Sequence, residues 1–421
     1  MPKYDYVIKG GSVLKGKLPV YGSKNAALPL LAASLLTDKE VALSNIPEIL
    51  DVRQMMNILN SMGVKTDKKN DVVKIQAKEV EMMGIEPDQV GLLRGSILLL
   101  GALLGRKREA ELPRPGGDII GARPIETHLD AFRQLGAKVR EQNGVVKIDG
   151  REMKAGRVVL REFSVTATEN TLMVAATLPG TTTISIAAAE PHVAALAKML
   201  IKMGAKIRGA GTHNITIQGV RKLKGATVSN IPDMLEAGFF ILLAAATRSQ
   251  LTIEPVPLQD LELFFKKLDD IGIKYDIDEK RQAVTIKKGS LKPFSMQSLP
   301  FPGIPTDLQA PFSVIATQTK GSSLIHDPLY EGRLKHILEL QKMGATAVMC
   351  DPHRVIVSGP TELHGSTIPS LDIRSGATLV MAGLIARGET VIKGAEIIDR
   401  GYARLAERLQ AVGAKIERRG R

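Results

Sequence analysis

The chain has 421 residues, a formal net charge of +13 and a single cysteine. This length favours two domains, and one cysteine excludes an internal disulfide framework and is typical of a reducing compartment. The positive charge favours an anionic partner, whereas the absence of tryptophan, with only six tyrosines and nine phenylalanines, disfavours the stacking surface of a nucleic-acid binder. Among anionic partners, a membrane surface and a phosphorylated small molecule therefore stay open, and nucleic acid is the weaker option.

The start of the chain lacks the apolar core of a secretory leader. The longest apolar run, residues 90–105, contains Arg94 and is short for a membrane span. We expect a cytoplasmic protein without membrane insertion.

One helix ending recurs six times along the chain. In each copy an apolar residue is followed four residues later by glycine, and a short segment typical of a β-strand comes next. Successive glycines are 73, 68, 68, 72 and 69 residues apart, so six repeats fill the chain. Each glycine is expected to take the left-handed conformation that closes a helix. The six are Gly63, Gly136, Gly204, Gly272, Gly344 and Gly413.

Apolar residues recur at helical spacing ahead of these glycines, as at Leu261, Phe264, Leu268 and Ile271, which predicts amphipathic helices that cover a sheet. A second segment in each repeat is apolar on nearly every face, and a helix without a polar face must be buried. These predicted buried helices are 24–36, 94–104, 169–178, 236–246, 307–317 and 374–386.

Each predicted buried helix also carries a charged residue near its first turn. Acids such as Glu169 and Glu236 can simply complement the helix dipole, which is an alternative to a functional role. Lys24, Arg94 and Arg374 carry the opposite sign, and a bound anion is the simplest compensation for them.

A loop at 115–124, rich in glycine and proline, carries one acid, Asp118, and one guanidinium, Arg123. Pro124 suits the first position of a helix, and a helix start beside arginine suits an anion. An ordinary surface loop has the same local composition, so that alternative stays open.

Arg123 and Arg400 each lie 13 residues before the glycine of their own repeat, at the entrance of an amphipathic helix. If three repeats make one domain, these two arginines face each other across a cleft and can clamp a phosphate. Glycine and proline near residues 21–23 and 229–232 mark the expected crossings between domains. The expected domains are 23–231, which carries the Asp118 loop, and 1–22 together with 232–421.

Six motifs spread over the chain are together far more specific than one glycine loop. They are Gly22-Ser23-Lys24-Asn25-Ala26-Ala27-Leu28-Pro29, Pro115-Gly116-Gly117 with Ile120-Gly121-Ala122-Arg123-Pro124, Ser164-Val165 with Ala167-Thr168-Glu169-Asn170, Pro305-Thr306-Asp307-Leu308-Gln309-Ala310, Asp372-Ile373-Arg374 and Asp399-Arg400-Gly401-Tyr402. With these motifs the chain resembles the enolpyruvyltransferase family over essentially its whole length. The resemblance implies an α/β fold of two inside-out α/β barrel domains, each of three βαβαββ repeats around buried helices.

The resemblance is strongest to family members that act on a UDP-sugar. It implies transfer of the enolpyruvyl group of phosphoenolpyruvate to the 3-hydroxyl of UDP-N-acetylglucosamine, with release of phosphate, in the first committed step of peptidoglycan synthesis. The reaction runs by addition and elimination through a tetrahedral adduct. No cofactor or metal is implied, because cationic side chains neutralise the charge, and no obligate protein partner is inferred.

The resemblance also assigns site residues for phosphoenolpyruvate. Lys24, Arg123 and Arg400 are expected to hold its phosphate, and Lys24 and Arg400 count as catalytic. Arg374 is expected to pair with its carboxylate, because a guanidinium fork matches a carboxylate better than a point charge does. Asn25 is expected to hydrogen-bond the reacting groups.

Two carboxyl groups are implied as acid and base. Asp118 is expected to protonate the methylene carbon of phosphoenolpyruvate, and Asp307 to take the proton from the sugar hydroxyl. The residues implied for UDP-N-acetylglucosamine are Arg94, Arg123, Pro124, Ile125, Glu126, Thr127, Ser164, Val165, Asp307 and Leu329.

The chain departs from the family pattern at three positions. Many members carry cysteine where Asp118 stands, and that thiol is the general acid and the nucleophile alkylated by fosfomycin. The departure predicts fosfomycin resistance. Thr166 stands where glycine is usual beside the uridine phosphates, and Met234 where arginine is common, so both departures bear on the choice of acceptor.

Three alternatives remain. A member of the same fold that acts on shikimate 3-phosphate would carry Gly-Asn-Ala-Gly-Thr, which is absent here. A catalytically silent sugar-nucleotide binder would fit the changes at Asp118 and Thr166, and a nucleic-acid binder would show strongly salt-dependent binding. His128 is either a ligand contact or a structural histidine, and Cys350 is expected to be a strand residue without a chemical role.

Overall fold

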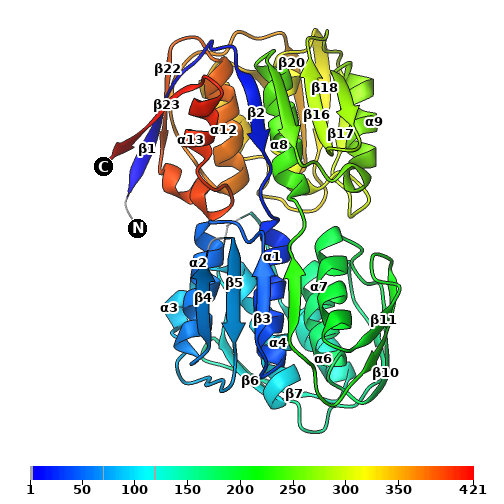
Figure 1. Cartoon of the computed structure of the whole chain (residues 1–421). Coiled ribbons are helices and arrows are strands. Elements are labelled where there is room, and N and C mark those ends of the chain that lie inside the picture. The colour runs from blue at the N-terminus through cyan, green and yellow to red at the C-terminus, as the bar shows by residue number, and fades with distance from the viewer. Residues whose placement is uncertain (1–2, 70, 118–119) are drawn as a thin grey trace. The chain divides into compact units, whose positions relative to one another are not determined.

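The computed structural model describes residues 3–69, 71–117 and 120–421, and Figure 1 traces the chain through them. The chain forms two compact units. Unit 1 contains 3–21, 120–122 and Pro232–Arg421, and unit 2 contains Gly22–Gly117 and Arg123–Ile231.

The short segment 120–122 groups with unit 1, although the sequence placed all of 23–231 in one domain. Two hydrogen bonds account for this. The backbone N–H of Gly332 donates to the carbonyl of Ile120 at 2.9 Å, and the N–H of Ala122 donates to Oε1 of Glu331 at 2.8 Å.

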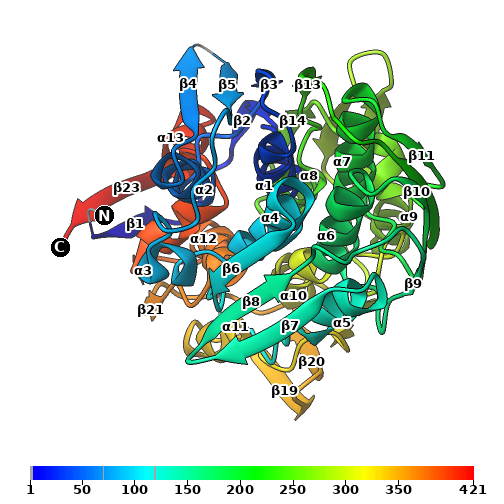
Figure 2. The same ribbon diagram turned by 90° about the horizontal axis from the view of Figure 1, so that it is seen from below.

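Unit 2 is built around three buried helical segments that pack on one another, and Figure 2 shows α1, α4 and α6 together inside it. They are α1 (Lys24–Ala33) with the 3-10 helix η1 (Ser34–Leu36), η2 (Arg94–Ile97) with α4 (Leu98–Lys107), and α6 (Val165–Ala175). The first three predicted buried helices are confirmed, and α6 begins four residues earlier than its prediction.

Three sheets and four outer helices complete unit 2. The helices are α2 (Leu50–Ser61), α3 (Pro87–Gly91), α5 (Glu126–Gln134) and α7 (Pro191–Lys202). The sheets have the orders β13-β3-β5-β4, β6-β8-β7 and β11-β12-β10-β9. Their strands are β3 (Val41–Ser44), β4 (Lys65–Lys69), β5 (Val72–Gln76), β6 (Glu109–Pro113), β7 (Lys138–Gln142), β8 (Val145–Asp149), β9 (Arg157–Val159), β10 (Gly180–Ser185), β11 (Lys206–Arg208), β12 (Asn214–Gly219) and β13 (Ala226–Ser229).

Unit 1 repeats this plan. Its buried helices are α8 (Met234–Ala246), η4 (Thr306–Leu308) with α10 (Gln309–Thr317), and α12 (Ile373–Ile385), as predicted. Because α8 is apolar on nearly every face, all of it except Ala245 is buried. The outer helices are η3 (Leu258–Leu261), α9 (Glu262–Ile271), α11 (His336–Lys342), η5 (Ala395–Arg400) and α13 (Leu405–Ala411).

The sheets of unit 1 have the orders β15-β16-β14-β2, β17-β18-β20-β19 and β21-β22-β1-β23. In the last of them β1 pairs with both β22 and β23, so strands from opposite ends of the chain lie side by side (Figure 1). The strands are β1 (Tyr4–Lys9), β2 (Lys15–Pro19), β14 (Gln250–Glu254), β15 (Lys274–Asp278), β16 (Ala283–Lys287), β17 (Ser295–Gln297), β18 (Gly321–His326), β19 (Thr346–Asp351), β20 (Arg354–Gly359), β21 (Thr367–Pro369), β22 (Glu389–Lys393) and β23 (Lys415–Gly420).

All six repeat glycines adopt the left-handed conformation, with φ between 82° and 113°, as the sequence predicts. A side chain at such a residue would cost about 1–2 kcal/mol, which explains glycine at every one of these helix ends. The amphipathic prediction is confirmed as well, since Leu261, Phe264, Leu268 and Ile271 are all buried on η3 and α9.

The start of α1 is fixed by asparagine side chains. Nδ2 of Asn45 donates to the carbonyl of Asn230 at 3.0 Å, and Nδ2 of Asn230 donates to that of Ser23 at 2.9 Å. A Cβ on Gly22 would lie 1.8 Å from the carbonyl oxygen of Asn45, so only glycine fits there. Oγ of Ser23 then caps α1 by accepting from the N–H of Ala26 at 3.3 Å.

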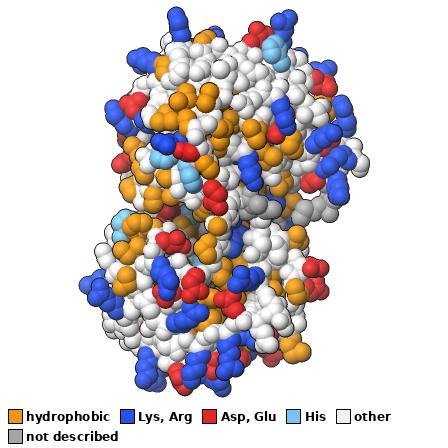
Figure 3. Space-filling model, turned by 180° about the vertical axis from the view of Figure 1, so that it is seen from behind, with side chains coloured by type: hydrophobic (Ala, Val, Ile, Leu, Met, Phe, Trp, Pro, Cys, Tyr) orange, Lys and Arg blue, Asp and Glu red, His pale blue; other side chains and the backbone are white. Residues whose placement is uncertain are grey.

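On the face drawn in Figure 3, basic side chains are dispersed among acidic and apolar ones and form no single block. Within the described ranges, none of the helices combines the length and the apolar character needed to cross a bilayer.

Candidate functional site

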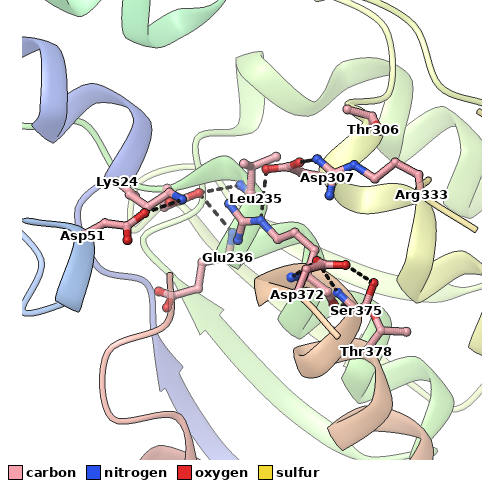
Figure 4. Close-up of polar contacts among 12 residues, drawn as sticks. Lys24, Asp51, Leu235, Glu236, Thr306, Asp307, Arg333, Asp372, Ser375 and Thr378 are labelled. Carbon is pink, nitrogen blue, oxygen red and sulfur yellow. Dashed lines mark hydrogen bonds and ion pairs between the residues drawn. The ribbon is translucent and has the colours of Figure 1, made fainter. Parts of the chain in front are cut away.

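Asp307 lies between two arginines in unit 1, and Figure 4 labels its contact with one of them, Arg333. Nε of Arg374 donates to its Oδ2 at 3.0 Å, and Nη2 of Arg333 donates to its Oδ1. The side chains of Arg374 and Arg333 are 5% and 10% exposed, so both cations are largely withdrawn from water. The carboxylate of Asp307 therefore compensates two buried charges at once.

Both arginines remain charged despite this burial. Burial alone would lower the pKa of Arg333, but the carboxylates of Asp307 and Asp372 outweigh it and raise the pKa above its usual value. Burial alone would also lower the pKa of Arg374. Tyr402 and Asp307 outweigh burial, so the pKa of Arg374 is raised as well.

Asp372 fixes the backbone from which the Arg374 side chain extends. It caps α12, because its Oδ1 accepts from the N–H groups of Arg374 at 2.8 Å and Ser375 at 3.0 Å. The guanidinium carbon of Arg374 lies 5.2 Å from the centroid of the Tyr402 ring. Among the described residues, the two Nη groups of Arg374 are buried without a hydrogen-bond partner. A carboxylate or phosphate oxygen would satisfy them.

Lys24 is the first residue of α1, and its Nζ lies 3.3 Å from Oδ2 of Asp51 on α2 (Figure 4). The two side chains are 14% and 6% exposed. Asp51 thus supplies part of the compensation that the sequence assigned to a bound anion, and the anion itself stays a prediction. Asn25 follows Lys24 and is half-buried.

Arg94 holds the backbone of the segment that follows the glycine-rich loop. Its Nη2 donates to the carbonyl of Arg123 at 2.7 Å and to that of Pro124 at 3.3 Å. Oγ1 of Thr127 donates to Oε1 of Glu162 at 2.9 Å. Arg94 and the segment 123–127, which were predicted to contact the same nucleotide sugar, therefore lie together in unit 2.

His128 is 2% exposed, with Nδ1 3.2 Å from the carbonyl of Ile125 and Nε2 2.8 Å from Oγ1 of Thr166. Burial, assisted by the charge of Arg94, lowers its pKa to about 3, so the ring is neutral. Of the two alternatives for His128, these contacts favour the structural one. Ser164 caps α6, because its Oγ accepts from the N–H of Ala167 at 3.4 Å.

Two further predicted residues, Arg400 and Leu329, lie in unit 1. Arg400 is the last residue of η5 and is half-buried. Leu329 is 39% exposed, and its N–H donates to Oδ1 of Asp327 at 3.0 Å. Asp118, the predicted general acid, lies outside the described residues. Cys350 is an exposed residue of β19, in agreement with its predicted place in a strand. In the described part of the chain, no three His, Cys, Asp or Glu side chains are grouped to hold a metal ion.

Sequence reasoning missed Arg333 and Asp51. A signal for both was present, because Arg333 lies 11 residues before Gly344 and Asp51 lies 12 before Gly63. These spacings are close to the 13 residues that separate Arg123 and Arg400 from their glycines. Comparing the helix entrances of all six repeats would have found them.

Residues 8–409 match the model of the EPSP synthase (3-phosphoshikimate 1-carboxyvinyltransferase) family. The chain belongs to this family of enolpyruvyltransferases, and the resemblance drawn from its motifs is confirmed. Its relatives narrow the class further. A protein of Treponema denticola named UDP-N-acetylglucosamine 1-carboxyvinyltransferase is 42% identical over 98% of this chain and 99% of its own.

Two further relatives carry the same name. The protein of Synechococcus sp. is 41% identical over 98% of this chain and 95% of its own, and UDP-N-acetylglucosamine 1-carboxyvinyltransferase 2 of Listeria monocytogenes is 40% identical over 98% and 97%. Among solved structures, the enolpyruvyl transferase NikO from Streptomyces tendae has a TM-score of 0.89 at 24% identity, covering all of both chains. EPSP synthase from Acinetobacter baumannii has a TM-score of 0.74 at 21% identity, covering 99% of this chain and all of its own. These structures confirm the predicted fold class.

Proposed function

We propose that this protein transfers the enolpyruvyl group of phosphoenolpyruvate to the 3-hydroxyl of UDP-N-acetylglucosamine and releases phosphate, as the first committed step of peptidoglycan synthesis. The observation that carries the proposal is the 42% identity, over 98% of the chain, to a relative with this name. The alternative acceptor, shikimate 3-phosphate, finds support only in the wider family and in structures at 21–22% identity.

The reaction consists of an addition and an elimination. The sugar oxygen adds to C2 of phosphoenolpyruvate while C3 gains a proton, which gives a tetrahedral adduct. A proton then leaves C3, the C–O bond to phosphate breaks and the double bond forms again. Positioned acid and base groups lower both barriers, each typically by about 10²- to 10⁴-fold in rate.

Arg374 is the proposed partner of the phosphoenolpyruvate carboxylate. Its Nε is already bound to Asp307, and its buried Nη groups have no partner among the described residues. A planar carboxylate fits that edge of the guanidinium. Asp307 is then held next to the same substrate, where it serves as the proposed base for the sugar hydroxyl.

Lys24, Arg123 and Arg400 are the proposed phosphate ligands. Lys24 and Arg123 belong to unit 2, and Arg400, like Asp307, belongs to unit 1.

Asp118 is the proposed acid that delivers the proton to C3. A carboxylate in place of the thiol is not alkylated by fosfomycin in the way a cysteine is, so we propose that the protein resists this inhibitor. The variant Asp118→Cys should become sensitive, with an adduct at position 118. Cys350 is exposed and serves as the internal control, because an adduct there would not require catalysis.

The decisive experiment measures phosphate release from phosphoenolpyruvate with UDP-N-acetylglucosamine, with UDP-N-acetylgalactosamine, with shikimate 3-phosphate and without any acceptor. Release only with UDP-N-acetylglucosamine is expected, and Asp307→Asn should slow it by about 10²- to 10⁴-fold. Phosphate release only with shikimate 3-phosphate would show that shikimate 3-phosphate is the acceptor, as in the alternative function. Absence of phosphate release with every acceptor would favour a sugar-nucleotide binder that does not transfer the enolpyruvyl group.

A further inference from the structure

A single hydrogen bond joins the start of α5 to the first turn of α6. Nε2 of His128 and Oγ1 of Thr166 are 2.8 Å apart, and the histidine is buried. The same ring reaches back three residues, with Nδ1 3.2 Å from the carbonyl oxygen of Ile125. The imidazole therefore bridges two chain segments that are 38 residues apart.

The chemistry of the partners fixes the direction of these bonds. A carbonyl oxygen only accepts, so Nδ1 of His128 carries the proton and donates to Ile125. In the neutral ring Nε2 then holds a lone pair, and the Thr166 hydroxyl donates to it. A side chain without a hydroxyl at position 166 would leave the buried Nε2 unsatisfied.

This bond completes a set of contacts around one short segment. The carbonyls of Arg123 and Pro124 accept from Arg94, and the next carbonyl, that of Ile125, accepts from His128. Three consecutive peptide groups are thus oriented by two buried or half-buried side chains. Through His128 and Thr166 the segment is also tied to the residues that follow Ser164 at the start of α6.

We propose that Thr166 and His128 are positioning residues for the nucleotide sugar, which hold the segment 123–127 in register with Ser164 and Val165. The inference rests on the proposed function, because those two segments are the ones assigned to UDP-N-acetylglucosamine. Neither Thr166 nor His128 needs to touch the ligand for this role. Their hydrogen bond reduces the conformational freedom that nucleotide binding would otherwise remove.

The test is the dissociation constant of UDP-N-acetylglucosamine, measured by titration calorimetry on the full chain. Thr166→Val keeps the shape and removes the hydroxyl, and it should weaken binding about threefold to tenfold, the effect of one hydrogen bond. Thr166→Ser keeps the hydroxyl and should stay within about twofold of the parent. The matched control is Thr171→Val on the same helix, because the Thr171 hydroxyl donates within that helix, to the carbonyl of Ala167 at 2.7 Å.

A double-mutant cycle isolates the bond itself. In His128→Asn the amide can still donate to the Ile125 carbonyl, but the acceptor for Thr166 is lost. Adding Thr166→Val to His128→Asn should weaken binding no further, because the two changes remove the same contact. In steady-state assays the KM for the acceptor should rise more than the KM for phosphoenolpyruvate, a split that general unfolding would not produce.

Equal weakening by Thr166→Ser and Thr166→Val would overturn the proposal, because the hydroxyl would then be irrelevant. Unchanged affinity for UDP-N-acetylglucosamine in Thr166→Val would also overturn the positioning role. In that case, binding of UDP-N-acetylglucosamine by the parent protein would still support the proposed function. If the parent protein bound no UDP-N-acetylglucosamine, both would fall together. Thr166→Ala is the second variant should Thr166→Val not fold, and the same outcomes apply to it.

Discussion

Nε2 of His336 lies 3.0 Å from Oγ of Ser313, and Nδ1 of the same ring lies 3.1 Å from the carbonyl oxygen of Arg333, three residues earlier. His128 has the same pattern of a carbonyl three residues back and a hydroxyl on a neighbouring buried helix. Each histidine stands eight residues before the glycine that ends its helix. Two repeats in different units therefore contain the same buried, neutral imidazole.

These histidines should make the protein sensitive to mild acid. Burial lowers the pKa to about 4 for His336 and, with the charge of Arg94, to about 3 for His128. An unfolded histidine titrates near 6.5, so the unfolded state binds protons first as the pH falls. The contribution of each neutral histidine to the free energy of unfolding is fully present above about pH 6.5. As the pH falls below that value, the contribution declines by about 1.4 kcal/mol per pH unit until the folded pKa is reached.

Urea unfolding at pH 7.5, 6.5 and 5.5 measures this decline. His336→Gln should lower the slope by the share of one histidine, because glutamine takes up no proton in this range. An equal change in the free energy of unfolding between pH 6.5 and 5.5 in the parent and in His336→Gln would contradict the assignment of His336 as a buried neutral histidine.

Asp307→Asn should affect both activity and stability. Asp307 is the proposed base, and its loss should lower kcat by about 10²- to 10⁴-fold. It also compensates Arg333 and Arg374, and leaving buried charges without their partner costs about 3–5 kcal/mol. The measurements are phosphate release and urea unfolding on the same preparations.

Adding Arg333→Met to Asp307→Asn separates the two effects. The double variant should regain stability, since one uncompensated cation has been removed, yet it should stay inactive. Restored turnover in the double variant would argue against Asp307 as the base.

The fold could be predicted from the sequence because each repeat contains a helix-ending signal made of neighbouring residues. Gly136 or Gly344, with its apolar neighbours, is enough to end a helix, and six such endings at intervals near 70 residues define the architecture. Buried helices such as α8 could be predicted because no polar face is left for solvent. Both signals depend only on residues close together in the chain.

Side-chain partners could not be predicted in the same way. The sequence showed cations at the starts of buried helices, but Lys24 pairs with Asp51, 27 residues on, and Arg374 pairs with Asp307, 67 residues back. Such pairs depend on how the repeats pack, which no local pattern encodes. The motif resemblance named Lys24, Arg374 and Asp307, but not Arg333, which is the second arginine bound to Asp307.

Glu236 illustrates the same limit and provides a further prediction. The helix dipole would account for an acid there, but its Oε1 accepts from Nη1 of Arg408 at 2.6 Å, and both side chains are 5% exposed. Arg408 also donates to the carbonyl of Pro19, and Oε2 of Glu236 accepts from the N–H of Tyr21 at 2.8 Å. The ion pair thus anchors the segment that follows β2.

Removing one partner should be far more harmful than removing both. Glu236→Gln leaves Arg408 buried without a counter-charge and should lower the free energy of unfolding by about 3–5 kcal/mol. Glu236→Gln combined with Arg408→Met should lose less than the sum of the single changes. Urea unfolding of the four proteins measures the coupling, and additive losses would show that the pair contributes nothing as a pair.

Glu169 is the opposite case, a buried acid that pairs with no cation among the described residues. It is 1% exposed, and among the described residues its Oε1 has no hydrogen-bond partner. Burial, with a smaller contribution from the charge of Glu190, raises its pKa well above the usual value. Burial thus opposes the ionised form of Glu169, which is the form that would complement the helix dipole.

Glu169→Gln should therefore stabilise the protein in a pH-dependent manner. An unfolded glutamate loses its proton near pH 4.3, whereas the folded one retains it, so the parent protein loses about 1.4 kcal/mol per pH unit above that value until the folded pKa is reached. Glutamine has nearly the same shape and does not titrate, so the variant should be the more stable one at pH 7.5 and nearly equal to the parent near pH 4.5. Glu152→Gln, at an exposed ion pair with Lys138, is the control and should change little. If the advantage of Glu169→Gln did not grow with pH, the carboxyl of Glu169 would have to be ionised in the folded state, with a partner that these contacts do not include.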